Sequence, residues 1–374
     1  MKFFTITLAI LYALLCNQLE AQTLTCAGQV CSSIPAPLLN QLNQSASNFQ
    51  TQYMKPVLTS ITESGFMANI ASSGVGMGKV RNFNLGVSLS AGGSKKEDIQ
   101  VRDNVVTFPK LPNVGASVAP NVQLDFNLGS ILFMDNTYLN RFHIFLHGMK
   151  YTVTEGDLKA ALREDSSYTI RGNFRGYGGN IRYEAIQEHF FFMGLVSWKG
   201  INIGGGVHFS NQDFDLTYRE ANAPRITFGG LNGRWGGDTK LDYRTKVQTT
   251  HVDVRTGIGL FYFLTIFAGG GVSWNRGDSN LSLSRTGPFV VSIGGLQDLN
   301  IPREYASLFQ GQPGAISQSG TLTLRTSESG RSNRTIGYFV GGLELDFFYA
   351  KILLEGVYAS KELAGASLGV KVTF

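Results

Sequence analysis

The residues best suited to bind or react fall at alternate positions of otherwise apolar segments. They are His143, His147, Arg182, Glu184, Asp253, Arg255, Glu344, Asp346 and Lys371, with Asp125 and Glu355 beside them in the same pattern. Successive side chains of a strand point to opposite faces, so these groups share the face opposite the apolar one. Opposite charges around a narrow lumen usually form a structural ion-pair network, and the alternative is a selectivity lining for a pore.

Metal binding and catalysis find little support among these residues. His143 and His147 share a face, but four residues along a strand span about 13 Å, so one metal ion would need ligands from other strands. Two glycine triplets, 204–206 and 269–271, fall in expected strands and lack the helix that cradles phosphate. The remaining histidines lie on different expected elements: His189, His208 and His251. We expect no catalytic residue, no metal and no cofactor.

Arg276-Gly277-Asp278 is the sharpest short motif in the chain. An exposed Arg-Gly-Asp can bridge an integrin metal site through the Asp while the Arg pairs with an acidic pocket, although so short a tripeptide also arises by chance. Across the motif, apolar residues change from even-numbered to odd-numbered positions. This change predicts a bulge or turn that lies above the lipid zone.

Strands must position all of these side chains. In the last strand one face carries Ala366, Leu368, Val370, Val372 and Phe374, and the other carries Ser367, Gly369, Lys371 and Thr373. Similar alternation recurs about ten times, which predicts an all-β fold: one antiparallel transmembrane barrel of about 10 strands, with 8–12 possible. The 45 glycines and 26 phenylalanines suit tight strands and aromatic girdles. A soluble periplasmic sandwich would show the same alternation and is the main rival.

Connections of unequal length give the expected barrel an orientation. Short turns near residues 130, 261 and 348 oppose long segments at 92–120, 222–238 and 287–320, as periplasmic turns oppose external loops. The strands that flank residues 222–238 run about twenty residues, more than the roughly 9–11 that cross a bilayer. Each changes apolar phase midway, which predicts paired bulges. A short helical insert is expected at residues 157–164.

The N-terminus has the features of an export signal, assigned to residues 1–21. Met1 and Lys2 give a positive start, Phe3 to Leu15 is apolar, and Ala21 offers a small residue at the cleavage site. Cys16 raises the question of lipidation, but Leu15 stands where a lipobox normally has a small residue. In an exported protein, Cys26 and Cys31 are expected to close a disulfide loop, because other soft metal ligands are missing nearby.

Residues 22–78 are expected to plug or cap the barrel formed by residues 79–374. A helical pattern runs from Pro35 to about Ser64, with a kink at Pro56, and a second helical piece covers Phe66 to Ala71. Its one-sided apolar stripe needs a surface that buries it, which favours the lumen or its mouth. The net charge of +5 is scattered without a Lys/Arg block, so nucleic-acid binding is not expected.

Four features together resemble a family of spirochaetal surface proteins, some described as adhesins. They are the Cys26/Cys31 pair, the single helical segment from Pro35, the strand Asn82 to Leu89 and the Phe374 ending. The resemblance implies an outer-membrane protein of a Gram-negative-type or spirochaetal cell that binds host matrix proteins or plasminogen. Barrels of this kind further imply that Phe374 is an assembly signal for the barrel-insertion machinery. The alternative function is a helix-gated channel for small or apolar solutes.

Overall fold

The computed structural model describes residues 23–28, 31, 36–103, 110–132, 138–154, 168–191, 195–219, 225–228, 231–293 and 316–374. The predictions for residues 1–21, including Cys16, and for the insert at residues 157–164 lie outside the described residues. Within the described ranges, no helix is long and apolar enough to cross a membrane.

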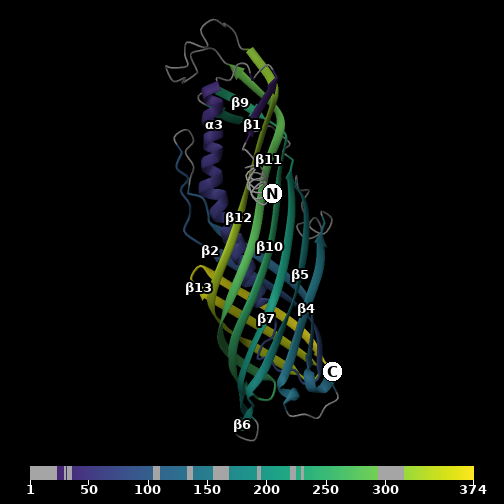
Figure 1. The fold of residues 1–374 in the computed structure, drawn as a ribbon. Helices are drawn as coiled ribbons and strands as arrows, with labels where there is room; N and C mark the ends of the chain where they lie inside the picture. Colours follow the sequence, from purple (N-terminus) through teal and green to yellow (C-terminus); the bar gives the residue numbers. More distant parts are fainter. Residues whose placement is uncertain are drawn as a thin grey trace, which may run out of the picture.

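Ten antiparallel strands close into a ring (Figure 1). In order around it they are β2 (Phe83–Lys95), β3 (Val114–Asn127), β4 (Phe142–Val153), β5 (Tyr168–Ile186), β7 (Val196–Tyr218), β10 (Asp238–Leu260), β11 (Leu264–Ile293), β12 (Ile316–Phe347), β13 (Ala350–Ser360) and β14 (Leu363–Thr373). The last strand pairs with the first from Leu363↔Ser94 to Thr373↔Asn84, which closes the ring. The predicted barrel of ten strands is confirmed, and the sandwich alternative is wrong.

The two ends of the barrel differ as expected. One end carries the turns at residues 261–263 and 348–349, the short helices α5 (Leu128–Ile131) and η2 (Leu139–Arg141), and the short strand β6 (His189–Phe191). The other end carries the β2–β3 connection and the hairpin of β8 (Arg225–Phe228) and β9 (Leu231–Trp235). We call these the turn end and the loop end.

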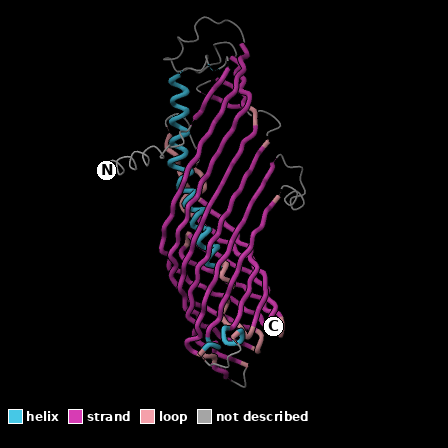
Figure 2. Tube along the Cα trace, turned by 45° about the vertical axis from the view of Figure 1, so that its right-hand side comes forward, coloured by secondary structure: helices cyan, strands magenta, loops and turns pink. Residues whose placement is uncertain are grey.

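The strands on one side of the ring reach much further toward the loop end than those on the other side (Figure 2). β7 and β10 have 23 residues each, β11 has 30 and β12 has 32, whereas β13 and β14 have 11. One row of paired residues, His208–Thr249–Asn275–Arg334, crosses β7, β10, β11 and β12. The parts of these strands on the loop side of this row are called the extension.

The predicted bulges in the middle of β7 and β10 are wrong. Pairing between the two strands is continuous from Tyr218↔Thr239 to Ile201↔Thr256, and the irregularities lie near the turn end instead. What changes along the strands is the surroundings of each face. Below the row, outward Val254 is apolar and 45% exposed; above it, the inward side chains include apolar Tyr243 and Val247, and Val247 is only 3% exposed. The same strand is therefore apolar on its outer face at one level, and at another level it is apolar on the inner face that packs against a helix.

Two helices precede the ring. α3 (Ala36–Phe49) and α4 (Lys55–Ala71) are joined by a π-helical turn, Gln50–Met54. Pro56 has no N–H to donate to the carbonyl of Gln52, which explains the irregularity beside the predicted kink. The break predicted between Ser64 and Phe66 is wrong, because α4 continues through both residues.

An unpredicted strand, β1 (Thr23–Gly28), precedes the helices. It pairs antiparallel with β12 in the extension, from Thr23↔Arg325 to Gly28↔Gly320. Cys26 and Cys31 form the expected disulfide, with their Cα atoms 5.5 Å apart. The N-terminal part of the described chain therefore lies at the loop end.

Candidate functional site: the plugged lumen

The plug, which we define as α4 with residues 72–80, lies inside the ring (Figure 2). Two glycines let the helix backbone lie directly on the wall. A Cβ on Gly92 would be 2.0 Å from the carbonyl oxygen of Ser64, and one on Gly115 would be 2.2 Å from that of Ser60. Phe66, Met67 and Ile70 of α4 pack into one apolar cluster with inward residues of the wall: Val247, Phe267, Ile336, Tyr338, Val340, Leu353, Val357 and Leu363.

Below the helix, a buried ion network joins three strands to the plug backbone. Arg255 donates to Asp253 (2.9 Å) and to Glu355 (2.7 Å), and Arg182 donates to the other oxygen of Asp253. Arg255 also donates to the Gly76 carbonyl at 2.7 Å, and the Gly76 N–H donates to Glu355 at 3.3 Å. Both polar groups of one glycine residue are thus held by the charges of the wall.

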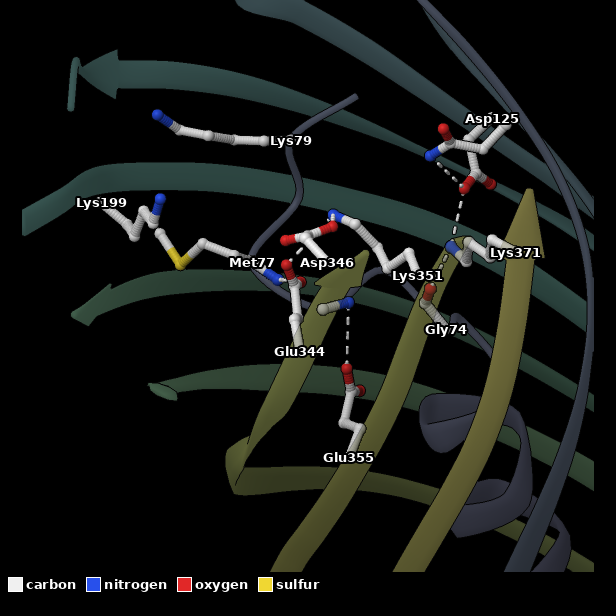
Figure 3. A network of polar contacts seen from close by, with 12 residues as sticks. Gly74, Met77, Lys79, Asp125, Lys199, Glu344, Asp346, Lys351, Glu355 and Lys371 are labelled. Carbon is white, nitrogen blue, oxygen red and sulfur yellow. Dashed lines mark hydrogen bonds and ion pairs between the residues drawn. The ribbon is translucent and has the colours of Figure 1, made fainter. Parts of the chain in front are cut away.

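A second attachment starts from the closing strand (Figure 3). Lys371 donates to the Gly74 carbonyl at 2.6 Å and to Asp125 of β3 at 2.7 Å. The Met77 N–H donates to Glu344, whose carboxylate also accepts from Lys351 at 3.2 Å. A plug backbone that would otherwise be unsatisfied in an enclosed space is therefore hydrogen-bonded to the wall at several points.

The lumen opens at the turn end into a vestibule of about 860 Å³, lined by charged residues and the aromatic turns. Lys79 at the end of the plug pairs with Glu184, and Glu188 accepts from Lys199 at 2.6 Å. Lys351 also pairs with Asp346 at 3.3 Å. Most of the residues predicted for the inner network are thus brought together. Sequence reasoning missed Lys79, Glu188, Lys199 and Lys351; Lys351 shares the parity of Glu355 and could have been found.

Three histidines lie side by side along the wall. His147 and His208 are stacked with ring centres 4.8 Å apart, and His208 and His251 are stacked at 5.0 Å. Gly178 of β5 leaves the space in which the first two meet, because a Cβ there would lie 2.7 Å from His208 Nδ1. His143 lies apart, beside Asn127 at 3.3 Å. In the described part of the chain, no group of three or more His, Cys, Asp or Glu is arranged to hold a metal ion.

The Arg-Gly-Asp motif is part of a regularly paired strand in the extension. β11 pairs without interruption with β10 and β12 through Arg276 and Asp278, so the predicted bulge or turn is wrong. Asp278 is paired with Arg331 at 2.7 Å. Gly277 faces inward, and a Cβ there would lie 2.2 Å from Thr62 of α4. The apolar phase change that suggested a turn comes from the change of surroundings, as in β7 and β10.

Sequence reasoning also overlooked a G-x-S-x-G spacing, Gly365-Ala-Ser367-Leu-Gly369. In a hydrolase this motif forms a sharp strand-to-helix turn that exposes the serine. Here all five residues lie within β14, and Ser367 is 3% exposed. The spacing therefore comes from the small inward residues that make room for the plug.

Outside the ring, apolar side chains form a band. On β11 it runs from Leu264 to Trp274, a length that suits a tilted membrane-crossing strand. Aromatic residues border the band, with Trp274 51% exposed at its upper edge and Phe347 47% exposed at its lower edge. A closed ring with an apolar outer band, and with buried ion pairs and a plug inside it, is the architecture of an integral outer-membrane β-barrel.

Within this class of protein, a comparison with family models identifies the family of the chain. The model described as Lsa36-like matches residues 18–374, so the chain belongs to the Lsa36-like family. A comparison with curated proteins finds no match.

Among solved structures, the chain is similar to the translocator domain of the autotransporter NalP from Neisseria meningitidis. The identity is 10%, the TM-score is 0.33, and the match covers 91% of this chain and 100% of that one. It is also similar to the outer membrane protease OmpT from Escherichia coli, with 10% identity, a TM-score of 0.35 and coverage of 79% and 97%. For Ail of Yersinia pestis the identity is 11% and the TM-score is 0.24, and the match covers 78% of this chain and 99% of that one. Likeness at scores this low carries no conclusion about function.

Proposed function

We propose that this protein is inserted in the outer membrane with its turn end in the periplasm, and that the extension and loops bind macromolecules outside the cell. The carrying observation is the combination of a filled lumen with an extension whose outer face is polar. Within the described residues, α4 and its side chains occupy the ring, while β7, β10, β11 and β12 hold a large surface above the apolar band. Binding at the cell surface would use the long extension. Conduction would need an open lumen, which α4 occupies.

The partners follow from the resemblance noted above: membrane lipid, the barrel-insertion machinery, and host matrix proteins or plasminogen. The test uses the full chain, refolded in detergent and checked for a heat-modifiable gel shift. Binding to immobilised matrix proteins and plasminogen is compared with that of a variant in which a short turn replaces residues 294–315. Ile293 and Ile316 are register partners, so a hairpin turn can join them. Equal binding by a folded variant would locate the contact elsewhere, and no binding by the wild type would refute these partners.

The vestibule supports a second candidate, a channel gated by movement of the plug. A disulfide can hold the plug in place. An ideal Cβ on Gly65 lies 3.8 Å from the Cβ of Val247, the usual separation in a disulfide. A Gly65→Cys/Val247→Cys variant should therefore cross-link α4 to β10. If the protein is a gated channel, conductance in planar bilayers should appear only after reduction. If it is a binding protein, reduced and oxidised forms should both stay closed.

A further inference from the structure

The chain passes through its own barrel from one end to the other. At the loop end, Ser45 and Asn48 of α3 each donate to Asp103 in the β2–β3 connection, both at 2.8 Å. Gln52 and Arg102 bond each other twice: the Arg102 N–H donates at 2.8 Å, and the Gln52 side chain donates to the Arg102 carbonyl at 3.1 Å. The start of the helical segment is therefore fixed to a loop of the loop end.

At the other end of the lumen the same segment meets the turn-end strands. Gly76 and Met77 bond to Glu355 and Glu344, and Phe83 then begins β2 beside the C-terminus, where its carbonyl accepts from the Phe374 N–H at 2.9 Å. Between Tyr53 and Phe83 the backbone thus covers the whole height of the lumen. The direction is from loop end to turn end.

From this path we infer that β1, the Cys26–Cys31 disulfide and α3 lie outside the cell and are carried across the outer membrane inside the barrel itself. The inference rests on the orientation in the proposed function. It adds a further function to the barrel, which is the display of its own N-terminal segment. It also enlarges the proposed binding surface, because β1 and α3 stand beside the extension.

The closed wall makes the inside of the ring the route for this segment. β14 and β2 are paired along eleven residues, so the seam where the ring closes does not admit a helix from the side. The segment therefore either threads through the ring or is enclosed as the ring closes. Small side chains suit both routes, since α4 places Ser60, Ser64 and Gly65 against the wall. A disulfide between residues five positions apart adds little width.

The native cysteines allow a test without a tag. Once the expected signal is removed, Cys26 and Cys31 are the only cysteines of the chain. Intact cells that produce the full-length protein are treated with a membrane-impermeant reductant and then with an impermeant maleimide. We expect labelling before permeabilisation, and none in a Cys26→Ser/Cys31→Ser variant.

Two single cysteine substitutions in that Ser/Ser background calibrate the orientation. Glu97→Cys lies in the β2–β3 connection, and Tyr262→Cys lies in a turn at the other end, where Tyr262 is 68% exposed. We expect the Glu97→Cys variant to label on intact cells and the Tyr262→Cys variant to label only after permeabilisation. If Glu97→Cys labels and the native pair does not, the inference is overturned and the proposed orientation stands. If Tyr262→Cys labels on intact cells and Glu97→Cys does not, both fall.

Discussion

The carbonyl oxygen of Ser64 in the plug faces the bare Cα of Gly92 in β2, where a methyl group would lie only 2.0 Å away. The Ala68 backbone nitrogen would be 2.5 Å from the same methyl, so neither neighbour can turn aside as a flexible side chain could. The close approach of α4 to β2 at this point therefore requires a glycine at position 92.

Gly92→Ala is therefore expected to push α4 off the wall. Overpacking of this kind costs about 1–3 kcal/mol, and the heat-modifiable gel transition should move to lower temperature. The matched control is Gly93→Ala on the opposite face of the same strand, where the nearest atom to the new Cβ is 3.9 Å away. Equal transitions for the two variants would show that the helix does not press on β2.

Glu355→Gln should destabilise the folded barrel more than any exposed charge change. Glu355 is fully buried and neutralises Arg255, which would keep its charge with only Asp253 as a counter-ion. Removing one partner of a buried pair costs about 3–5 kcal/mol. The comparison is with Asp278→Asn, which breaks the exposed pair with Arg331 and should leave the transition unchanged. Thermal unfolding in detergent measures both, and equal transitions would show that the buried pair does not hold the plug.

An acidic pair in the extension should make its stability depend on pH. Asp242 and Asp215 are direct neighbours on β10 and β7. Partial burial, and then the hydrogen bond with Asp215, raise the pKa of Asp242 above its ordinary value. The folded state therefore holds this proton more tightly than the unfolded state. The proton stabilises the extension at acid pH, and this contribution is lost as the pH rises from the ordinary pKa of an aspartate through the raised pKa of the folded state.

Asp242→Asn should consequently stabilise the extension at pH 7 and have no effect at pH 3. Protease susceptibility of the extension, followed at both pH values, measures the difference. A variant that behaves like the wild type at pH 7 would show that solvent screens the two carboxylates from each other.

The Arg-Gly-Asp motif is expected to be dispensable for cell attachment. An integrin-type contact uses an exposed turn, whereas Asp278 lies on a paired strand and is engaged by Arg331. Asp278→Glu should leave adhesion of cells to a protein-coated surface unchanged. A several-fold loss of adhesion, with the barrel transition intact, would restore the motif as a binding site.

Phe374→Ala is expected to slow insertion into the membrane rather than weaken the finished barrel. Phe374 is 64% exposed, and its ring contacts Phe83 on the first strand, with ring centres 5.9 Å apart. Pulse–chase conversion to the heat-modifiable form should be delayed, while the unfolding transition of the inserted fraction stays close to wild type. Normal conversion would remove the assembly role and leave the barrel unaffected.

Alternation of side chains was enough to predict the ring, its two ends and most of the inner charges, since parity assigns residues such as Arg255 and Lys371 to a face directly. It failed where the apolar residues of one strand move from the outer face to the inner face, as between outward Val254 and inward Val247, because the pattern then shifts without any change in the backbone. Contacts between distant segments could not be predicted either. The pairing of β1 with β12 and of Lys79 with Glu184 depends on register and on the path of the plug.

The unbroken register of β10, β11 and β12 also restricts how this protein can change its length. One residue inserted near Thr249 would turn every later side chain of that strand to the other face, so inward and outward residues would exchange their surroundings. An insertion of two residues would keep every side chain on its own face, and it would move the loops outward by one pleat. Variants of the extension that remain functional should therefore differ by even numbers of residues on each strand, and odd changes should be confined to the connections.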